Sequence, residues 1–262
     1  MKRMLGWFAV AALATLLTAC GASNTNIRPS SSSSSSAGSG GHSPAQINTQ
    51  LGIAYLQDGR KDMALQQLKK ALQQDPDLAE AHNAIAIVYE QLGEIKLAER
   101  HFRRALALDP KDSSANNNYG QLLCRAGRYQ EAQGHFLAAV KNPLYKRPSV
   151  AYTNAALCLP SDAPPGKAER YLRAALQANP LYPGALIEMA RLKHKQGDNQ
   201  DALKYLQRYE RAAGVNPDML LLGVKIQRAL GNTAGELHYV KLLRSRYPDS
   251  PQVTELQKLN GQ

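Results

Sequence analysis

Residues 83–110, NAIAIVYEQLGEIKLAERHFRRALALDP, contain one copy of a pattern that recurs along the chain. In this copy Ala86 is followed by Ala98 and Phe102, and the segment ends at Pro110. Residues of the same kind stand 34 positions away on both sides: Gly52, Ala64, Leu68 and Pro76 on the N-terminal side, and Gly120, Ala132 and Phe136 on the C-terminal side. Single matches between small residues arise easily by chance, but this many in one register indicate a 34-residue repeat.

Each repeated position has a structural role in a pair of helices. Ala86 and Ala98 allow two helices to cross closely, where a larger side chain would force them apart. Phe102 fills the gap between repeats, and Pro110 ends the second helix because proline lacks an N–H and clashes with the preceding turn. The pattern resembles the tetratricopeptide repeat (TPR). That resemblance implies an all-α fold, a right-handed superhelix of about six helix–turn–helix repeats that binds other proteins.

The repeat predicts one TPR domain over residues 45–262. We expect units near 45–78, 79–112, 113–148, 149–182, 183–216 and 217–250. A last helix from about Ser250 would form the polar cap that such a stack needs. The stretch Asn142-Pro143-Leu144-Tyr145 shifts the fourth unit by two residues relative to the third.

The N-terminus has the three-part pattern of a signal peptide over residues 1–19. Lys2 and Arg3 supply positive charge, and an apolar stretch follows from Met4 to Leu17. At about fourteen residues this stretch is shorter than the roughly twenty that a permanent transmembrane helix needs. We therefore expect the segment to be removed.

The exit from this segment, Leu17-Thr18-Ala19-Cys20, resembles the bacterial lipobox. The resemblance implies cleavage before Cys20 and a covalent lipid on Cys20. The alternative is an ordinary cleaved signal with an incidental cysteine. Gly21 stands where Asp would resemble an inner-membrane retention signal, so we expect a lipid anchor in the outer membrane and a TPR domain in the periplasm.

Residues 20–44 are expected to be a flexible tether that follows the lipidated cysteine. Seven serines, Ser30 to Ser36, and several glycines leave almost no apolar surface to offset the entropy of ordering. Loss of the signal peptide lowers the formal charge from +11 by two, to +9, so the mature chain stays basic. Because the chain is exported, we expect no nucleic-acid partner, and the scattered cations fit a solvated surface.

The third and fourth units carry a more specific pattern. Asn117-Asn118-Tyr119-Gly120-Gln121-Leu122-Leu123-Cys124, Asn142-Pro143-Leu144-Tyr145 and the Tyr152 to Cys158 stretch resemble the type IV pilus biogenesis/stability lipoproteins of the PilF/PilW family. Lys146-Arg147 departs from that pattern at a turn. The resemblance implies a pilotin, an outer-membrane lipoprotein that binds the pilus secretin subunit and promotes its localisation and multimerisation. A different class of function, a periplasmic TPR scaffold for peptidoglycan enzymes or outer-membrane protein assembly, remains an alternative.

The inner face of a TPR superhelix is lined mainly by the first helix of each unit. In this register the candidate partner-binding residues are Ile53, Leu56, Asn83, Ile87, Asn117 and Gln121. Its apolar members indicate an interaction site, unless a neighbouring helix covers them. The two asparagines could hydrogen-bond the backbone of a ligand, or could only fix the starts of their helices.

Cys124 and Cys158 lie 34 residues apart on the first helices of neighbouring units. An oxidising periplasm allows a disulfide if their Cα atoms come within about 4.4 to 6.8 Å, and two buried free thiols are the alternative. We find no Cys-x-x-Cys, no His-Glu-x-x-His and no glycine-rich phosphate loop. We therefore expect no enzymatic activity, no catalytic or metal site, no small-molecule substrate and no cofactor besides the lipid on Cys20.

Overall fold

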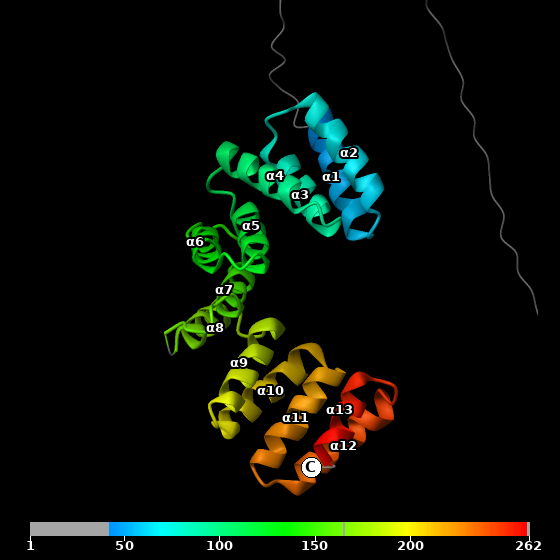
Figure 1. Cartoon of the computed structure of the whole chain (residues 1–262), viewed down its shortest axis with the longest axis vertical. Coiled ribbons are helices and arrows are strands. Elements are labelled where there is room, and N and C mark those ends of the chain that lie inside the picture. The colour runs from blue at the N-terminus through cyan, green and yellow to red at the C-terminus, as the bar shows by residue number, and fades with distance from the viewer. Residues whose placement is uncertain (1–41, 165, 261–262) are drawn as a thin grey trace, which may run out of the picture. The chain divides into compact units, whose positions relative to one another are not determined.

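The computed structural model describes residues 42–164 and 166–260, and every regular element in these ranges is an α-helix (Figure 1). The signal peptide, Cys20 and tether residues 20–41 lie outside the described residues. The helices are α1 (Pro44–Gln57), α2 (Lys61–Gln74), α3 (Ala79–Gln91), α4 (Ile95–Leu108), α5 (Ser113–Arg125), α6 (Tyr129–Val140), α7 (Pro148–Leu157), α8 (Lys167–Ala178), α9 (Pro183–Lys195), α10 (Asn199–Ala213), α11 (Pro217–Ala229), α12 (Thr233–Arg246) and α13 (Pro251–Asn260).

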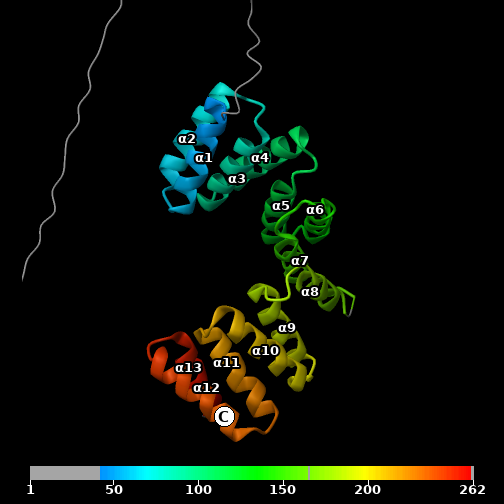
Figure 2. The ribbon, with the colours of Figure 1, turned by 180° about the vertical axis from the view of Figure 1, so that it is seen from behind.

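Twelve of these helices form six successive pairs, as the repeat predicts. The helices α1 and α2, α3 and α4, α5 and α6, α7 and α8, α9 and α10, and α11 and α12 pack against each other most extensively (Figure 2). Each pair also packs on the next one along the chain, which gives the stacked superhelix of a TPR protein. The prediction of an all-α TPR superhelix is confirmed.

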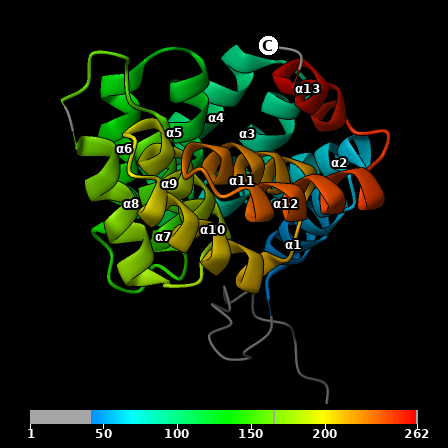
Figure 3. The same cartoon turned by 90° about the horizontal axis from the view of Figure 1, so that it is seen from below.

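The last helix, α13, packs on both α11 and α12. Seen from below, a loop at the right of the view leads from α12 into α13, drawn in red (Figure 3). Leu256 of α13 is fully buried against this pair, whereas the outward residues of the helix are polar. In the part of the chain that the structure describes, none of the helices is long and apolar enough to cross a bilayer.

Local sequence explains where the helices begin and turn. Ser43 and Gln46 form a capping box at α1, with N–O distances of 3.2 and 2.8 Å. Asp112 caps α5 by accepting hydrogen bonds from the backbone N–H groups of the first turn. Gly93 ends the turn of the second pair at a φ of 81°, a left-handed conformation that glycine adopts without a steric penalty.

A glycine or alanine marks the crossing point within a helix pair. A Cβ atom added to Gly120 would lie 2.8 Å from the Phe136 ring, so the ring packs directly on the α5 backbone. Gly52 and Gly223 show the same arrangement with Leu68 and with Tyr239, at 2.6 and 2.8 Å. The small residue and the large residue of each repeat therefore form one packing unit, and its buried members build the core of the stack.

Candidate partner-binding groove

A cavity of about 510 Å³ opens on the side of the stack formed by the first helices of the first three pairs. Its residues come from α1, from α3, from the start of α5 and from the turn before α7. They are Ile53, Leu56, Gln57, Glu80, Asn83, Ala84, Ile87, Asp112, Ser114, Asn118 and Arg147. The structure therefore brings four of the six candidate groove residues, Ile53, Leu56, Asn83 and Ile87, to one site.

The apolar part of the cavity is made by Ile53 and Leu56 of α1 and Ile87 of α3. All three side chains are half-buried, and each packs on one side against a core cluster. The two expected alternatives were an open interaction site and side chains covered by a neighbouring helix. Neither fits completely, because no helix among the described residues covers these side chains and yet part of each belongs to the core. The remaining surface gives a partner an apolar floor of limited area.

The asparagines of this face bond to one another across the repeats. Asn118 Nδ2 donates a hydrogen bond to Asn83 Oδ1 over 3.2 Å, and Asn154 Nδ2 donates one to Asn117 Oδ1 over 3.0 Å. These bonds join α3 to α5 and α5 to α7. The expectation that Asn83 and Asn117 only fix the starts of their helices is wrong, because Asp112 caps α5 and neither asparagine acts as a cap.

Two candidate residues lie outside the cavity. Asn117 is only 3% exposed and points into the contact with the next pair. Gln121 is half-buried one turn farther along α5 and is not among the residues that line the cavity. The neighbouring Asn118 takes the place that the repeat register assigned to Asn117.

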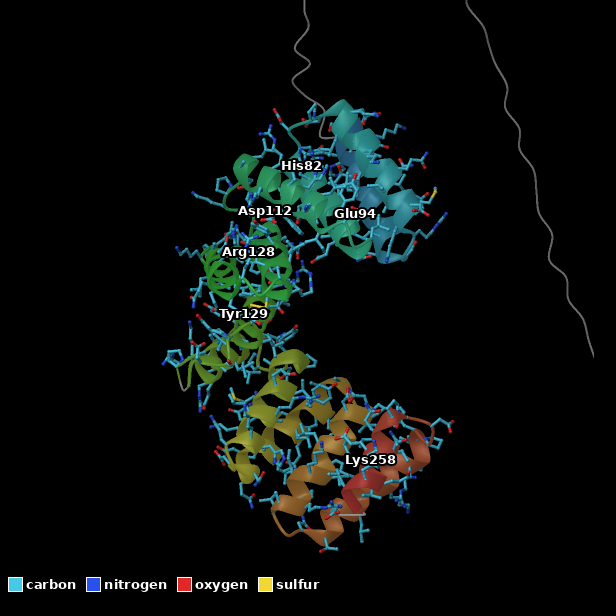
Figure 4. All side chains as sticks on the ribbon, viewed as in Figure 1. His82, Glu94, Asp112, Arg128, Tyr129 and Lys258 are labelled. Carbon is cyan, nitrogen blue, oxygen red and sulfur yellow. A yellow bond between two sulfur atoms is a disulfide. The ribbon has the colours of Figure 1, made fainter. Side chains whose placement is uncertain are left out.

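The repeat register did not point to three charged residues at the cavity, Glu80, Asp112 and Arg147. Glu80 and Asp112 carry negative charge at its wall, and Arg147 carries positive charge there; Asp112 is labelled at the start of α5 in Figure 4. Glu90 and Arg125, farther along α3 and α5, form an ion pair. Arg147 belongs to the lengthened turn before α7, so the departure of Lys146-Arg147 from the family pattern was the signal that could have identified it.

A disulfide joins the third and fourth pairs. The structure bonds Cys124 of α5 to Cys158, which follows the last residue of α7, and their Cα atoms are 5.7 Å apart. That separation lies within the range disulfides usually span. The two-residue shift in the repeat register therefore does not keep the sulfurs apart, and the free-thiol alternative is not the state that the structure contains.

A group of polar side chains around Glu99 of α4 joins the second pair to the third, away from the cavity. Glu99 of α4 accepts hydrogen bonds from Arg128 at 2.7 Å, from Tyr119 at 3.0 Å and from Arg103 at 2.6 Å. The hydrogen bond from Arg128 is the main cause that lowers the pKa of Glu99, although burial opposes it. In the described part of the chain no group of three or more His, Cys, Asp or Glu side chains is placed to hold a metal ion.

Comparison with known proteins agrees with the helical repeat. A TPR repeat model matches residues 52–93, and tetratricopeptide repeat models match residues 83–146 and 165–226. The type IV pilus assembly protein PilF of Pseudomonas aeruginosa is 32% identical over 208 residues, which cover 79% of this chain and 82% of that protein.

Solved structures give the same relationship in three dimensions. The crystal structure of PilW, described as a widely conserved type IV pilus biogenesis factor, matches with a TM-score of 0.75 and 33% identity, over 83% of this chain and 100% of that one. Pseudomonas aeruginosa PilF matches with a TM-score of 0.74 and 33% identity, over 82% and 97% of the two chains. YrrB, a TPR protein with an unusual peptide-binding site, shares 18% identity at a TM-score of 0.55 and supports the fold alone.

Proposed function

Because the chain belongs to the family of type IV pilus TPR proteins that includes PilF and PilW, we propose that it is a pilotin of type IV pilus biogenesis. In this role it binds a segment of the pilus secretin subunit and promotes assembly of the secretin ring in the outer membrane. The family relationship supports pilus biogenesis, and the groove described above supplies the reason for a binding role.

The observation that carries the proposal is the mixed character of the groove. Three half-buried aliphatic residues, Ile53, Leu56 and Ile87, form its floor, and charged residues stand at its wall. A peptide segment of the secretin would place apolar side chains on this floor and set its register through polar contacts with Asn83 and Arg147. Aliphatic anchors inside a polar rim are a common arrangement in protein–protein interfaces.

A lipid on Cys20 would place this groove at the outer membrane. One acyl chain holds a protein only reversibly, whereas the several chains of a bacterial lipoprotein anchor it stably. A secretin segment bound in the groove would be shielded from premature association while the lipid brings the complex to the membrane. Binding and anchoring are separate parts of this mechanism and can be tested separately.

A deletion strain tests the role, with complementation by the wild-type chain and by Cys20→Ala. We expect the deletion to abolish detergent-resistant secretin multimers and surface pili, and wild type to restore both. The Cys20→Ala protein is expected to bind secretin subunits without supporting multimers in the outer membrane. Normal multimers and pili in the deletion strain would exclude the pilotin role.

A pull-down from detergent-solubilised membranes separates the proposal from the scaffold alternative. Under the proposal the secretin subunit is recovered with the protein, and recovery depends on the groove. Peptidoglycan enzymes or components of outer-membrane protein assembly, recovered in place of the secretin, would favour a scaffold.

A further inference from the structure

Two turns of the stack share one sequence and one conformation. Asn142-Pro143-Leu144-Tyr145 follows α6, and Asn179-Pro180-Leu181-Tyr182 follows α8. In both turns the asparagine Oδ1 accepts a hydrogen bond from the leucine N–H, at 3.0 and 3.1 Å, and the asparagine carbonyl accepts one from the tyrosine N–H at 3.1 Å. The identical bonds hold the two leucines in equivalent positions.

These two leucines are unusually exposed for large aliphatic side chains. Leu144 is 84% exposed and Leu181 is 61% exposed. The equivalent positions after α2 and α4 hold Asp77 and Lys111, residues that suit a solvated turn. Two successive units thus present a leucine to solvent where the earlier units present a charged residue.

The two turns are neighbours along one edge of the stack. Turns between repeats recur on the same side of a solenoid. The turns that hold Leu144 and Leu181 each lead from the second helix of one pair to the first helix of the next, and these pairs are consecutive. We call this edge the leucine edge and define it by Leu144 and Leu181.

Positive charge surrounds Leu144. Lys111, Lys146 and Arg147 line a hollow of about 410 Å³ together with Leu144, and Lys141 lines an adjoining hollow together with Lys111. On the second turn, an Arg208 Nη atom donates a hydrogen bond to the Pro180 carbonyl oxygen over 2.7 Å.

Two carboxylates, those of Asp109 and Asp112, line the same hollow, but both accept backbone hydrogen bonds within their own turn. The site therefore combines the cations Lys111, Lys141 and Lys146 with an exposed leucine, which matches a phosphate group attached to an apolar tail.

We propose that the leucine edge docks on an anionic phospholipid surface, with Leu144 and Leu181 entering the boundary between headgroups and acyl chains and Lys111, Lys141 and Lys146 contacting lipid phosphates. Shallow insertion of apolar side chains beside cations is how peripheral proteins bind such surfaces. The docking sets which edge of the stack meets the bilayer, and this edge adjoins the groove, because Asp112, Ser114 and Arg147 line both hollows.

The test uses the protein purified from membranes and reconstituted into vesicles, so that anchoring is the same in every sample. Leu144→Trp and Leu181→Trp report the depth of each turn through emission wavelength and quenching by brominated acyl chains. The reference is Leu237→Trp on α12, where the leucine is also 61% exposed. The chain's single native tryptophan, Trp7, lies in the signal peptide that we expect to be removed, so the introduced tryptophan is expected to be the one emitter of its kind in each mature variant.

In vesicles of phosphatidylcholine with phosphatidylglycerol, we expect the emission of the tryptophans introduced at positions 144 and 181 to be shifted to the blue and quenched by bromine. The emission of the tryptophan introduced at position 237 should be unaffected. Vesicles of phosphatidylcholine alone should reduce the quenching. We expect Lys141→Gln and Lys146→Gln each to lower the ratio of docked to undocked protein about fivefold, because each removes one cation from the edge. Lys241→Gln on α12 is the control and should have no effect.

Three outcomes would overturn the proposal. The first is quenching at positions 144 and 181 that equals the quenching at position 237. The second is quenching that is independent of phosphatidylglycerol and of the lysines. The third is a blue shift of the emission from the tryptophan at position 144 that a soluble protein extract causes and vesicles do not. That result would assign the edge to a protein partner. Both leucines are exposed, so the tryptophan variants should unfold at the wild-type temperature, and circular dichroism checks this.

Discussion

Asn118 Nδ2 donates a hydrogen bond to Asn83 Oδ1 over 3.2 Å, and this contact joins the first helices of two neighbouring 34-residue repeats. The next junction uses Asn154 and Asn117 in the same way, at 3.0 Å. Amide-to-amide hydrogen bonds thus join the second pair to the third and the third pair to the fourth, with Asn83 and Asn117 buried and Asn118 and Asn154 half-buried. These bonds orient α5 against α3 and α7 against α5.

We expect Asn154→Ala to lower the free energy of unfolding by about 1 to 3 kcal/mol, because Asn117 is only 3% exposed and its Oδ1 loses its donor from the next repeat. Urea denaturation followed by circular dichroism measures the change. Gln130→Ala, at an exposed site on α6, is the control and should stay within about 0.5 kcal/mol of wild type. If Asn154→Ala lowered the free energy of unfolding no more than the control does, the amide hydrogen bonds would not contribute to the stability of the stack.

The glycines of the third pair give opposite predictions for one type of substitution. A Cβ at position 120 would lie 2.8 Å from the Phe136 ring, whereas a Cβ at Gly134 of α6 would have no neighbour within 4 Å. We expect Gly120→Ala to destabilise by about 1 to 3 kcal/mol through overpacking, and Gly134→Ala to stabilise by about 0.5 to 1 kcal/mol through helix propensity. Thermal unfolding of both variants, compared with wild type, tests the sign of each effect. Equal shifts of the same sign would contradict the close crossing.

The disulfide closes a loop of 34 residues between Cys124 and Cys158. Loop-closure entropy for this length corresponds to about 3 to 4 kcal/mol. We expect reduction with dithiothreitol to lower the unfolding temperature of the wild type but not that of the double variant Cys124→Ser, Cys158→Ser, which should already unfold at the lower temperature. Free thiols detected by mass spectrometry in protein taken from its native compartment would show that the bond does not form there.

The repeat could be predicted from sequence because its signal is geometric. Ala86 and Phe102 recur at fixed spacing, since helices can cross closely only where a small residue faces a large one. That spacing gives the order of the first helix pairs, and it loosens beyond Val140, where the fourth unit is shifted by two residues. Nothing in the structure tests the predictions for the first 41 residues, including lipidation of Cys20, and they remain predictions.

The groove was only partly predictable, and the errors have a common physical cause. A repeat register assigns residues to a face but does not specify small rotations of a helix, so the position expected for Asn117 is taken by Asn118. Arg147 reaches the cavity from a lengthened turn that no repeat position describes. Contacts between turns and helices depend on tertiary structure, and a periodic pattern cannot supply them.

The groove predicts where a partner can be blocked without unfolding the protein. Ile53 and Leu56 are half-buried against the core, so Asp at either position would combine lost binding with lost stability. Gln57 lines the same cavity and is exposed. We expect Gln57→Arg to weaken recovery of the secretin subunit at least tenfold in a pull-down, with an unchanged unfolding temperature. Gln66→Arg, at an exposed site on α2, is the control, and equal recovery with both variants would move the interface elsewhere.

His101 of α4 should make the stability of the stack depend on pH. Its Nδ1 atom lies 2.9 Å from Nδ1 of His82, and Tyr89 stacks on its ring with centroids 5.5 Å apart. Burial, with His82 and Arg100 adding to it, lowers the pKa of His101 from 6.5 to about 4. The unfolded chain therefore binds the proton first as the solution is acidified. Stability is full above pH 6.5 and falls as the pH decreases from 6.5 toward 4.

Chemical denaturation at several pH values between about 7 and 4 measures this slope. We expect His101→Asn to flatten it. His82→Asn should flatten it only in part, because burial of His101 remains, and because this change copies the Asn116–His135 pair of the next repeat, whose Oδ1–Nδ1 distance is also 2.9 Å. His135 itself has a pKa lowered mainly by burial, so some slope should persist in every variant. If wild type and His101→Asn lost stability in parallel, the histidine pair would not be the group that titrates.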